Sequence, residues 1–344
     1  MNLNQTDCRD YKWVLERLVK FIKQRECVAL IEKSVKEHLP KEEYEEIFKG
    51  FSKIASISES SSVEPVGYKE TIDQRTEKRE DVNKVRVMGI PTGIAHLDDA
   101  TGGRGWMPGE FYIVLGPAKS GKSQALGWFG NTAAKCGNTV AYFTLEVSAD
   151  IITSRIDAMN TDIAVNDLPY RAKEACGKLK EFGMKGDIII FDYPAKGCTV
   201  AEIERQLKRL EVERGIHIDL LVVDYMDLIR HTKNYEEDWA GQVDTARELR
   251  ALAKVRQIPV ISASQINRTG AKKEIVQSTD KAGAWGVVAE VDGCITIGAS
   301  PKGRQNERVL FLSDFRNAPQ SCIRIRTNYG LGKFFEAFVE EIYI

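Results

Sequence analysis

Apolar residues recur at steps of three and four positions along the first forty residues of the chain. They are Trp13, Val14, Leu18, Phe21, Ile22, Val28, Leu30, Ile31 and Val35. Lysine and glutamate occupy many of the positions between them, so the pattern predicts an amphipathic helix over residues 10–38. Pro40 ends this helix, and a second one is predicted over residues 41–57.

A polar stretch follows these two helices. Five serines fall within residues 56–62, and residues 64–84 are charged with few apolar positions. This composition is typical of a linker, because it offers little surface to bury in a core. We expect a helical region over 1–57 and a linker over 58–87, in which residues 71–82 form a short helix.

From residue 88 onward, short apolar runs alternate with helical patterns. The runs are residues 111–115, 139–145, 188–191, 220–223, 260–263, 294–297 and 309–312. Helices are predicted between the earlier runs, over residues 123–135, 149–159, 200–213 and 242–255. Continuous apolar strands separated by helices indicate an α/β domain over 88–344, with a mainly parallel twisted sheet flanked by helices. The later connections are shorter, so one edge of the sheet is expected to be antiparallel, with residues 333–344 as an added strand.

Composition narrows the class of protein. The chain has 344 residues, of which 43% are hydrophobic and 29% charged, so a largely disordered chain is excluded. No apolar run approaches the ~18–20 residues that span a bilayer, and the N-terminus is polar. The seven cysteines are scattered without a Cys-x-x-Cys pair, which favours a cytoplasmic protein without disulfides. A formal charge of -1 argues against a generally basic surface but leaves a local basic channel open.

The strongest motif is a glycine-rich loop directly after the strand predicted over 111–115. It fits G-x-x-x-x-G-K-[ST] with Gly116, Pro117, Ala118, Lys119, Ser120, Gly121, Lys122 and Ser123, and Gln124 follows in the predicted helix. Such a loop curls so that backbone N–H groups face phosphate oxygens at a helix N-terminus. Lys122 would reach the β- and γ-phosphates of ATP, and the Ser123 hydroxyl would bind Mg²⁺. The alternative is a glycine-rich turn without a ligand.

Three polar residues end predicted strands at the edge where this loop lies. Asp224 follows the apolar run 220–223 and is the candidate carboxylate for Mg²⁺. Glu146 follows the run 139–145 and could orient or deprotonate the attacking water, or could simply favour the dipole of the next helix. Gln265 closes the stretch 260–264 and could contact the γ-phosphate, or could be an ordinary polar strand end.

A series of short strings gives this set a family resemblance. They occupy residues 91–94, 97–98, 101–103, 116–123, 143–148, 222–228, 248–253 and 262–265. Their order and spacing resemble those of DnaB-like replicative helicases. The strings at residues 155–158, 193–194 and 285–286 are similar to the phage-encoded branch of that family. The helix before the linker also resembles the element that docks on a neighbouring subunit in those rings.

The resemblance implies a RecA-like P-loop ATPase that translocates on single-stranded DNA and unwinds duplex at a replication fork, with 5′ to 3′ polarity. It also implies a homo-oligomeric, usually hexameric, ring with ATP sites between subunits. The family's arginine finger corresponds to Arg316, although Asp314 stands where the family often has lysine. A guanidinium suits this role because it is always charged and binds phosphate bidentately. A plain surface arginine is the alternative.

DNA contacts are expected from the loops that follow Asp227 and Gln265. The second of these carries Arg268, Lys272, Lys273 and Lys281, and could track the phosphates of a single strand or be an ordinary solvated loop. Primase, polymerase or a helicase loader are candidate partners. Only about sixty residues precede the linker, fewer than the family's N-terminal domain, so coupling to primase by that route is in doubt. Two other functions stay open: a RecA-, RadA- or KaiC-like recombinase or regulatory ring, and a non-motor loader or assembly factor.

Overall fold

A computed structural model describes most of the chain, in two compact units, Met1–Glu77 and Lys78–Ile344. The described residues are 8–55, 68–69, 72–73, 76–77, 89–101, 103, 105–233, 235, 237–266, 275–277, 284–298, 304–313, 315 and 320–342. Within them, no helix combines the length and the apolar character that crossing a membrane requires. Most of the expected linker lies outside these residues, so its boundaries and its short helix stay predictions.

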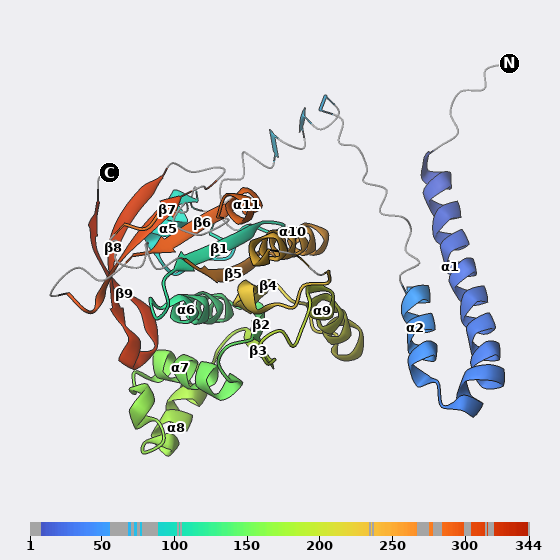
Figure 1. The fold of residues 1–344 in the computed structure, drawn as a ribbon, viewed down its shortest axis with the longest axis horizontal. Helices are drawn as coiled ribbons and strands as arrows, with labels where there is room; N and C mark the ends of the chain where they lie inside the picture. Colours follow the sequence, from blue (N-terminus) through green and yellow to red (C-terminus); the bar gives the residue numbers. More distant parts are fainter. Residues whose placement is uncertain are drawn as a thin grey trace. The chain divides into compact units, whose positions relative to one another are not determined.

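The first unit contains two helices that pack side by side (Figure 1). Helix α1 (Cys8–Lys33) continues into a π-helical turn η1 (Ser34–His38) and a 3₁₀ turn η2 (Leu39–Lys41), and α2 (Tyr44–Ala55) follows. They are in close contact at Gly50, where an added Cβ would lie 2.5 Å from Leu30 Cδ1. The predicted helices are confirmed, but the second begins at Tyr44 rather than residue 41.

The second unit is built on a nine-stranded sheet in the order β3-β2-β4-β5-β1-β6-β7-β8-β9. The strands are β1 (Phe111–Gly116), β2 (Thr139–Thr144), β3 (Asp187–Asp192), β4 (Leu220–Asp224), β5 (Val260–Gln265), β6 (Gly293–Ile297), β7 (Glu307–Ser313), β8 (Ser321–Asn328) and β9 (Lys333–Glu341). Neighbouring strands from β3 to β6 pair in parallel, and those from β6 to β9 pair antiparallel. The mainly parallel sheet with one antiparallel edge is therefore confirmed.

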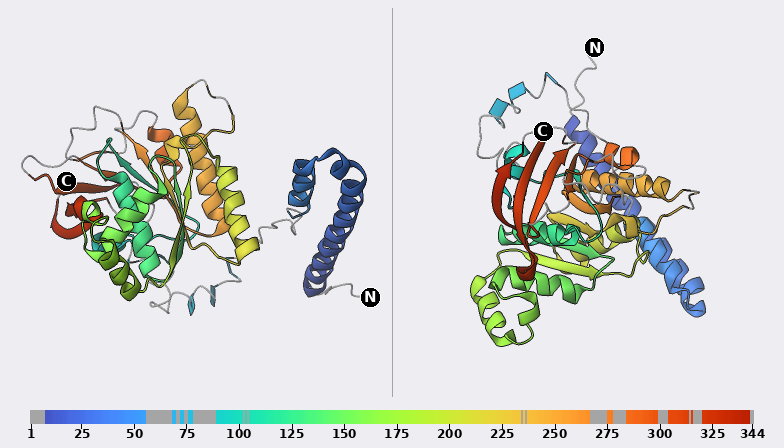
Figure 2. Two further views of the ribbon diagram at one scale, coloured as in Figure 1. Left: turned by 90° about the horizontal axis from the view of Figure 1, so that it is seen from below. Right: turned by 60° about the vertical axis from the view of Figure 1, so that its left-hand side comes forward.

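Helices cover both faces of this sheet (Figures 1 and 2). Helices α6 (Lys122–Lys135) and α7 (Ala149–Thr161) pack on one face, with α5 (Ala95–Ala100) on the same side. Helices α9 (Val200–Arg214), α10 (Asp238–Arg256) and α11 (Ala284–Ala289) pack on the other. Alternate residues of β1 enter the two cores: Phe111 one and Tyr112 the other. This double burial explains why the central strands are continuously apolar.

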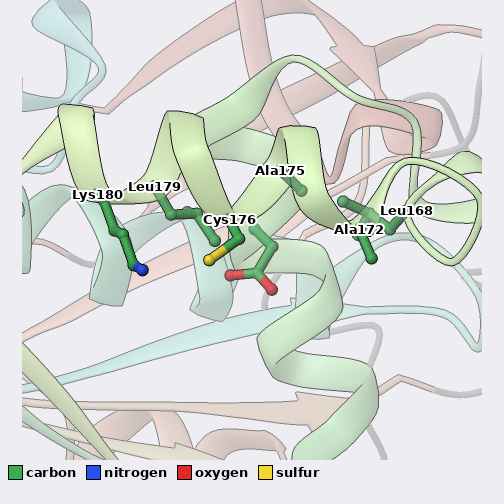
Figure 3. Close-up of a pocket in the computed structure, with 7 residues that line it drawn as sticks. Leu168, Ala172, Ala175, Cys176, Leu179 and Lys180 are labelled. Atoms are coloured by element: carbon green, nitrogen blue, oxygen red, sulfur yellow. The ribbon is translucent and has the colours of Figure 1, made fainter.

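Helices α5 and α11 of this unit were not predicted, and neither was α8 (Ala172–Phe182). It packs on α7, and a mostly apolar hollow of about 390 Å³ lies at that contact. Figure 3 shows α8 residues Ala172, Ala175, Cys176, Leu179 and Lys180 lining it together with Leu168, and Asp157 completes the lining. None of these residues belongs to the predicted nucleotide site.

Candidate active site

The glycine-rich loop joins the end of β1 to the start of α6, as the motif predicts. Gly121 has φ +103°, and a Cβ there would lie 2.1 Å from the Tyr329 hydroxyl. A Cβ on Gly116 would lie 2.5 Å from Ser120 Oγ. Neither position has room for a Cβ beside the side chains as they stand, and Gly121 also has the left-handed backbone that favours glycine. The loop can therefore curl tightly around a small anion at the N-terminus of α6.

The Lys122 ammonium lies folded against its own loop. Its Nζ donates to the carbonyl oxygens of Gly116 at 3.0 Å and Pro117 at 2.9 Å. The hydroxyl of Ser120 is buried and has no hydrogen-bond partner in the described structure. The loop thus holds a cation and an unpaired polar group in the position where the motif binds phosphate.

Asp224 ends β4 and is completely buried. Its Oδ1 accepts a hydrogen bond from Ser123 Oγ at 3.0 Å, and its Oδ2 accepts one from the Tyr142 hydroxyl at 3.0 Å. Burial raises the pKa of Asp224 to about 6, although both hydrogen bonds act to lower it. Ser123 and Asp224 therefore contact each other across 101 residues of sequence.

Burial and three nearby carboxylates act in opposite directions on the pKa of the Lys122 ammonium. Burial lowers the pKa of Lys122, while the nearby charges of Glu146, Asp227 and Asp224 act in the opposite direction. Glu146 also contributes to the raised pKa of Asp224. The predicted residues Lys122, Glu146 and Asp224 thus lie within electrostatic reach of one another, at the carboxyl ends of β1, β2 and β4.

Glu146 lies just after the end of β2, and a backbone hydrogen bond holds this strand end beside β4. The N–H of Leu145 donates to the carbonyl of Asp224 at 2.8 Å, which joins the ends of β2 and β4. The Glu146 side chain is exposed, and α7 begins three residues later at Ala149. A carboxylate at this point is open to solvent on the same edge of the sheet as the glycine-rich loop.

Gln265 lies directly beside the glycine-rich loop, because β5 pairs with β1 so that Gln265 is opposite Gly116. Its backbone N–H donates to Asp227 Oδ2 at 2.9 Å. The Ser264 hydroxyl lies 2.6 Å and 2.7 Å from the two oxygens of the same carboxylate. Asp227 belongs to the 3₁₀ turn η4 (Met226–Leu228) that follows β4. It therefore ties the ends of β4 and β5 together at the site.

A second set of contacts supports the loop from the antiparallel edge of the sheet. The carbonyl oxygen of Ser120 accepts hydrogen bonds from the Tyr329 hydroxyl at 2.9 Å and from Arg308 Nε at 3.3 Å. The Arg308 guanidinium lies over the Tyr329 ring, 5.3 Å from its centroid. Arg308 comes from β7 and Tyr329 from the 3₁₀ turn η7 (Tyr329–Leu331). These two side chains connect the glycine-rich loop to the last strands.

A family model described as "DnaB-like helicase C terminal domain" matches residues 89–279, more than half of the chain. The chain belongs to this family. The matched region contains the glycine-rich loop, Glu146, Asp224 and Gln265, and it ends before β6.

The chain is also similar in sequence to individual replicative helicases. The replicative DNA helicase DnaC of Bacillus subtilis (strain 168) is 30% identical over 187 residues, which cover 53% of this chain and 40% of that protein. A DnaB-like replicative helicase of Enterobacteria phage T4 is 23% identical over 305 residues, covering 84% and 64% respectively. The chain thus spans well under two thirds of the length of the Bacillus helicase.

Solved structures give the same result for the fold. The chain superposes on a structure titled "ATPase Domain of G40P" with a TM-score of 0.68 and 17% identity, covering 80% of this chain and 99% of that one. A DnaB-like replicative helicase, solved in a study of its interactions with primase, gives a TM-score of 0.66 and 15% identity over 97% and 80% of the two chains. The fold is therefore that of the DnaB-like ATPase domain, as predicted.

Some residues expected from the DnaB-like pattern lie outside the described part of the chain. They are Arg316 and the four basic residues Arg268, Lys272, Lys273 and Lys281. Sequence reasoning also missed three side chains that contact the site: Tyr142, Arg308 and Tyr329. The one available signal was Tyr142, since a tyrosine within a buried aliphatic strand needs a partner for its hydroxyl.

Proposed function

We propose that this chain is an ATP-driven DNA helicase motor, which translocates on single-stranded DNA and opens duplex at a replication fork. The observation that carries the proposal is the meeting of Lys122, Ser123 and Asp224 at the glycine-rich loop of a DnaB-like domain. A loop of this kind binds nucleotide phosphates, and the family membership supplies the work done with them.

The residues of the site fit Mg·ATP. Mg²⁺ prefers oxygen ligands and takes few protein carboxylates, and the Ser123 hydroxyl and Asp224 Oδ1 are two oxygens only 3.0 Å apart. When bound, Mg²⁺ would neutralise charge on the β- and γ-phosphate oxygens. Lys122 would exchange the carbonyls of Gly116 and Pro117 for phosphate oxygens, and the backbone N–H groups of residues 118–124 would line the remaining phosphates.

Hydrolysis would use the residues at the strand ends. Glu146 would accept a proton from water as the water oxygen bonds to the γ-phosphorus, while the bond to the β–γ bridging oxygen breaks and ADP leaves. Gln265, held beside the loop, would contact the γ-phosphate. Arg316 would come from the next subunit and stabilise the developing charge, which requires a homo-oligomeric ring, of six subunits in this proposal, with ATP sites between subunits.

Single-stranded DNA would pass the loops that follow Asp227 and Gln265, with Arg268, Lys272, Lys273 and Lys281 contacting its phosphates. This interaction should weaken with salt, because binding releases counterions from the strand. Such a motor would work in the cytoplasm and join primase, polymerase or a helicase loader. The DnaB-like helicase of the second structure was studied with primase, which supports primase as a partner class.

A forked DNA substrate with labelled strands tests the proposal. The wild-type protein should release the strand only with ATP and Mg²⁺, and Lys122→Ala should abolish release. Lys173→Ala is the matched control, because this lysine is exposed on α8, outside the site, and should leave unwinding unchanged. Strand exchange without unwinding would favour the recombinase alternative. Nucleotide binding without DNA-stimulated hydrolysis would favour a non-motor assembly factor.

A further inference from the structure

The carboxylate of Asp224 is held on both of its oxygens. Ser123 donates to Oδ1 and Tyr142 donates to Oδ2, each at 3.0 Å. Ser123 belongs to the glycine-rich loop, and its hydroxyl is the expected metal ligand. Tyr142 belongs to β2 and has no part in the roles assigned above.

The sheet places Tyr142 for this contact. β2 and β4 pair in parallel, with Tyr142 opposite Val222. Asp224 lies two residues beyond Val222, so it is on the same face of the sheet as Tyr142. The ring is completely buried between the sheet and α6, and a Cβ added to Gly130 of α6 would lie 3.7 Å from Tyr142 Cδ2. The hydroxyl thus points along the strand at Asp224 from a ring that packing holds in place.

We propose that Tyr142 is a positioning residue for the metal site: it holds Oδ2 of Asp224 so that Oδ1, beside the Ser123 hydroxyl, is the oxygen presented to Mg²⁺. The inference rests on the proposed function, since it concerns the Mg·ATP that this function requires. Hydrogen bonds to the far side of a metal ligand fix its orientation, and their removal typically costs 10–100-fold in metal affinity.

The chemistry of the side chain supports this role over simple packing. Phenylalanine would fill the same space in β2 without placing a hydroxyl in a core. The Tyr142 hydroxyl donates its hydrogen bond to Oδ2 of Asp224, so it leaves Oδ1 available to the metal. Without it, the carboxylate keeps only the Ser123 hydrogen bond and gains freedom to rotate about its Cβ–Cγ bond.

The chain offers a closely matched control in Tyr112 of β1. This residue is also buried in a strand, and its hydroxyl also donates to a carboxylate, Glu110 Oε2, at 2.5 Å. Glu110 is not a residue of the candidate site. Tyr112→Phe therefore removes a phenol–carboxylate hydrogen bond, together with the one that this hydroxyl accepts from the Met107 N–H at 3.1 Å, without touching Asp224.

The experiment titrates Mg²⁺ into the full-length chain with a fluorescent ADP analogue, and repeats the binding measurement in EDTA. Tyr142→Phe should raise the half-saturating Mg²⁺ concentration by about tenfold or more, while affinity for the analogue in EDTA stays the same. Tyr112→Phe should leave both quantities unchanged. Thermal unfolding midpoints of the two variants measure the structural cost of losing each hydroxyl.

Equal losses of stability in the two variants with an unaltered Mg²⁺ titration would show that Tyr142 only packs, and the proposal would be overturned. A failure of the wild-type protein to couple Mg²⁺ to nucleotide binding would instead overturn the proposed function, and this inference with it. The two failures are distinguishable, because the first is seen only in the variant and the second in the wild type. If Tyr142→Phe does not fold, Ser123→Ala with Tyr142 intact should raise the half-saturating Mg²⁺ concentration, and no change there would count against the metal site itself.

Discussion

Asp224 carries a completely buried carboxylate and is the proposed carboxylate ligand of the metal. Burial favours its protonated form and raises its pKa from 3.8 to about 6, while the hydrogen bonds from Ser123 and Tyr142 favour the ionised form. An ionised Asp224 therefore costs folding free energy near neutral pH, and that cost is offset when a cation is bound. The proposed metal site would therefore gain cation binding at the expense of the stability of the free protein.

This arrangement makes stability depend on pH in a known direction. Because the folded-state pKa lies above the unfolded one, folding takes up a proton between pH ~6 and ~4, and the free energy of unfolding due to this group rises as pH falls through that window. Asp224→Asn should therefore be more stable than wild type above pH ~6, by up to about 3 kcal/mol, with the advantage fading toward pH ~4. Urea unfolding in EDTA at several pH values measures this; an advantage that does not change with pH would refute it.

Gly121 of the loop is tightly enclosed and has a left-handed backbone. Ala at this position would need φ +103°, and its Cβ would lie 2.1 Å from the Tyr329 hydroxyl. Gly121→Ala should cost at least about 2 kcal/mol of stability and weaken nucleotide binding at least tenfold. Gly177→Ala is the control, since nothing lies within 4 Å of its added Cβ on α8, and it should be neutral or slightly stabilising. Denaturant unfolding measures the stability of both variants, and nucleotide titration measures their affinity.

Between elements, the carboxylate of Asp227 links η4 to the end of β5. It accepts from the Gln265 N–H and the Ser264 hydroxyl, and Gln265 lies beside Gly116. Asp227→Ala should let the end of β5 move and lower the rate of ATP hydrolysis about tenfold or more. This corresponds to an activation free energy that is higher by ~1.4 kcal/mol or more. Affinity for Mg·ADP should fall less than hydrolysis does, because Asp227 reaches that site only through its charge near Lys122, whereas the Gln265 that it holds is proposed to contact the γ-phosphate, which ADP lacks.

Ser264→Ala provides the graded comparison for this link. It removes the hydroxyl contact and leaves the bond from the Gln265 N–H, so its effect on hydrolysis should be smaller. Steady-state hydrolysis beside equilibrium binding separates the two quantities. If Asp227→Ala weakened Mg·ADP binding as much as hydrolysis, Asp227 would support the whole loop rather than the end of β5.

The elements could be predicted from sequence where their pattern is local. The central strands are buried on both faces and read as unbroken apolar runs. β8 alternates buried residues with Arg324 and Arg326 and reads as a charged segment. α8 carries Ala172, Ala175, Cys176 and Leu179 at helical spacing, but these residues are mostly small, and the helix was missed. The glycine-rich loop was found because its residues are contiguous.

The contacts around that loop could not be found in the same way. Tyr142 meets Asp224 across 82 positions, and Tyr329 meets Ser120 across 209. Both contacts depend on the order of strands in the sheet, which no local pattern in the sequence records. The carboxylate Asp227 was likewise taken only as the start of a loop, because its partners on β5 lie 37 and 38 positions away.

Over the whole chain, 49 basic residues balance 50 acidic ones. A motor that encloses its strand needs positive charge only where the strand passes, so a net charge of -1 is compatible with DNA as the substrate. The four basic residues of the loop after Gln265 are local in this sense. Their role, like that of Arg316, stays a prediction, because they lie outside the described residues.

In the proposed ring, each ATP site would combine Lys122 of one subunit with Arg316 of the next. Lys122→Ala and Arg316→Ala should each abolish hydrolysis when assayed separately. In a ring assembled at random from equal amounts of the two, about one interface in four would pair an intact Lys122 with an intact Arg316. Hydrolysis should therefore return to roughly a quarter of the wild-type rate if sites act independently, and less if they must hydrolyse ATP in sequence.

The two variants must be dissociated and reassembled together, and each variant reassembled with itself is the control. If Arg316 instead acted on the ATP of its own chain, every site in the mixed ring would lack one of the two residues, and no activity would return at any ratio of the variants.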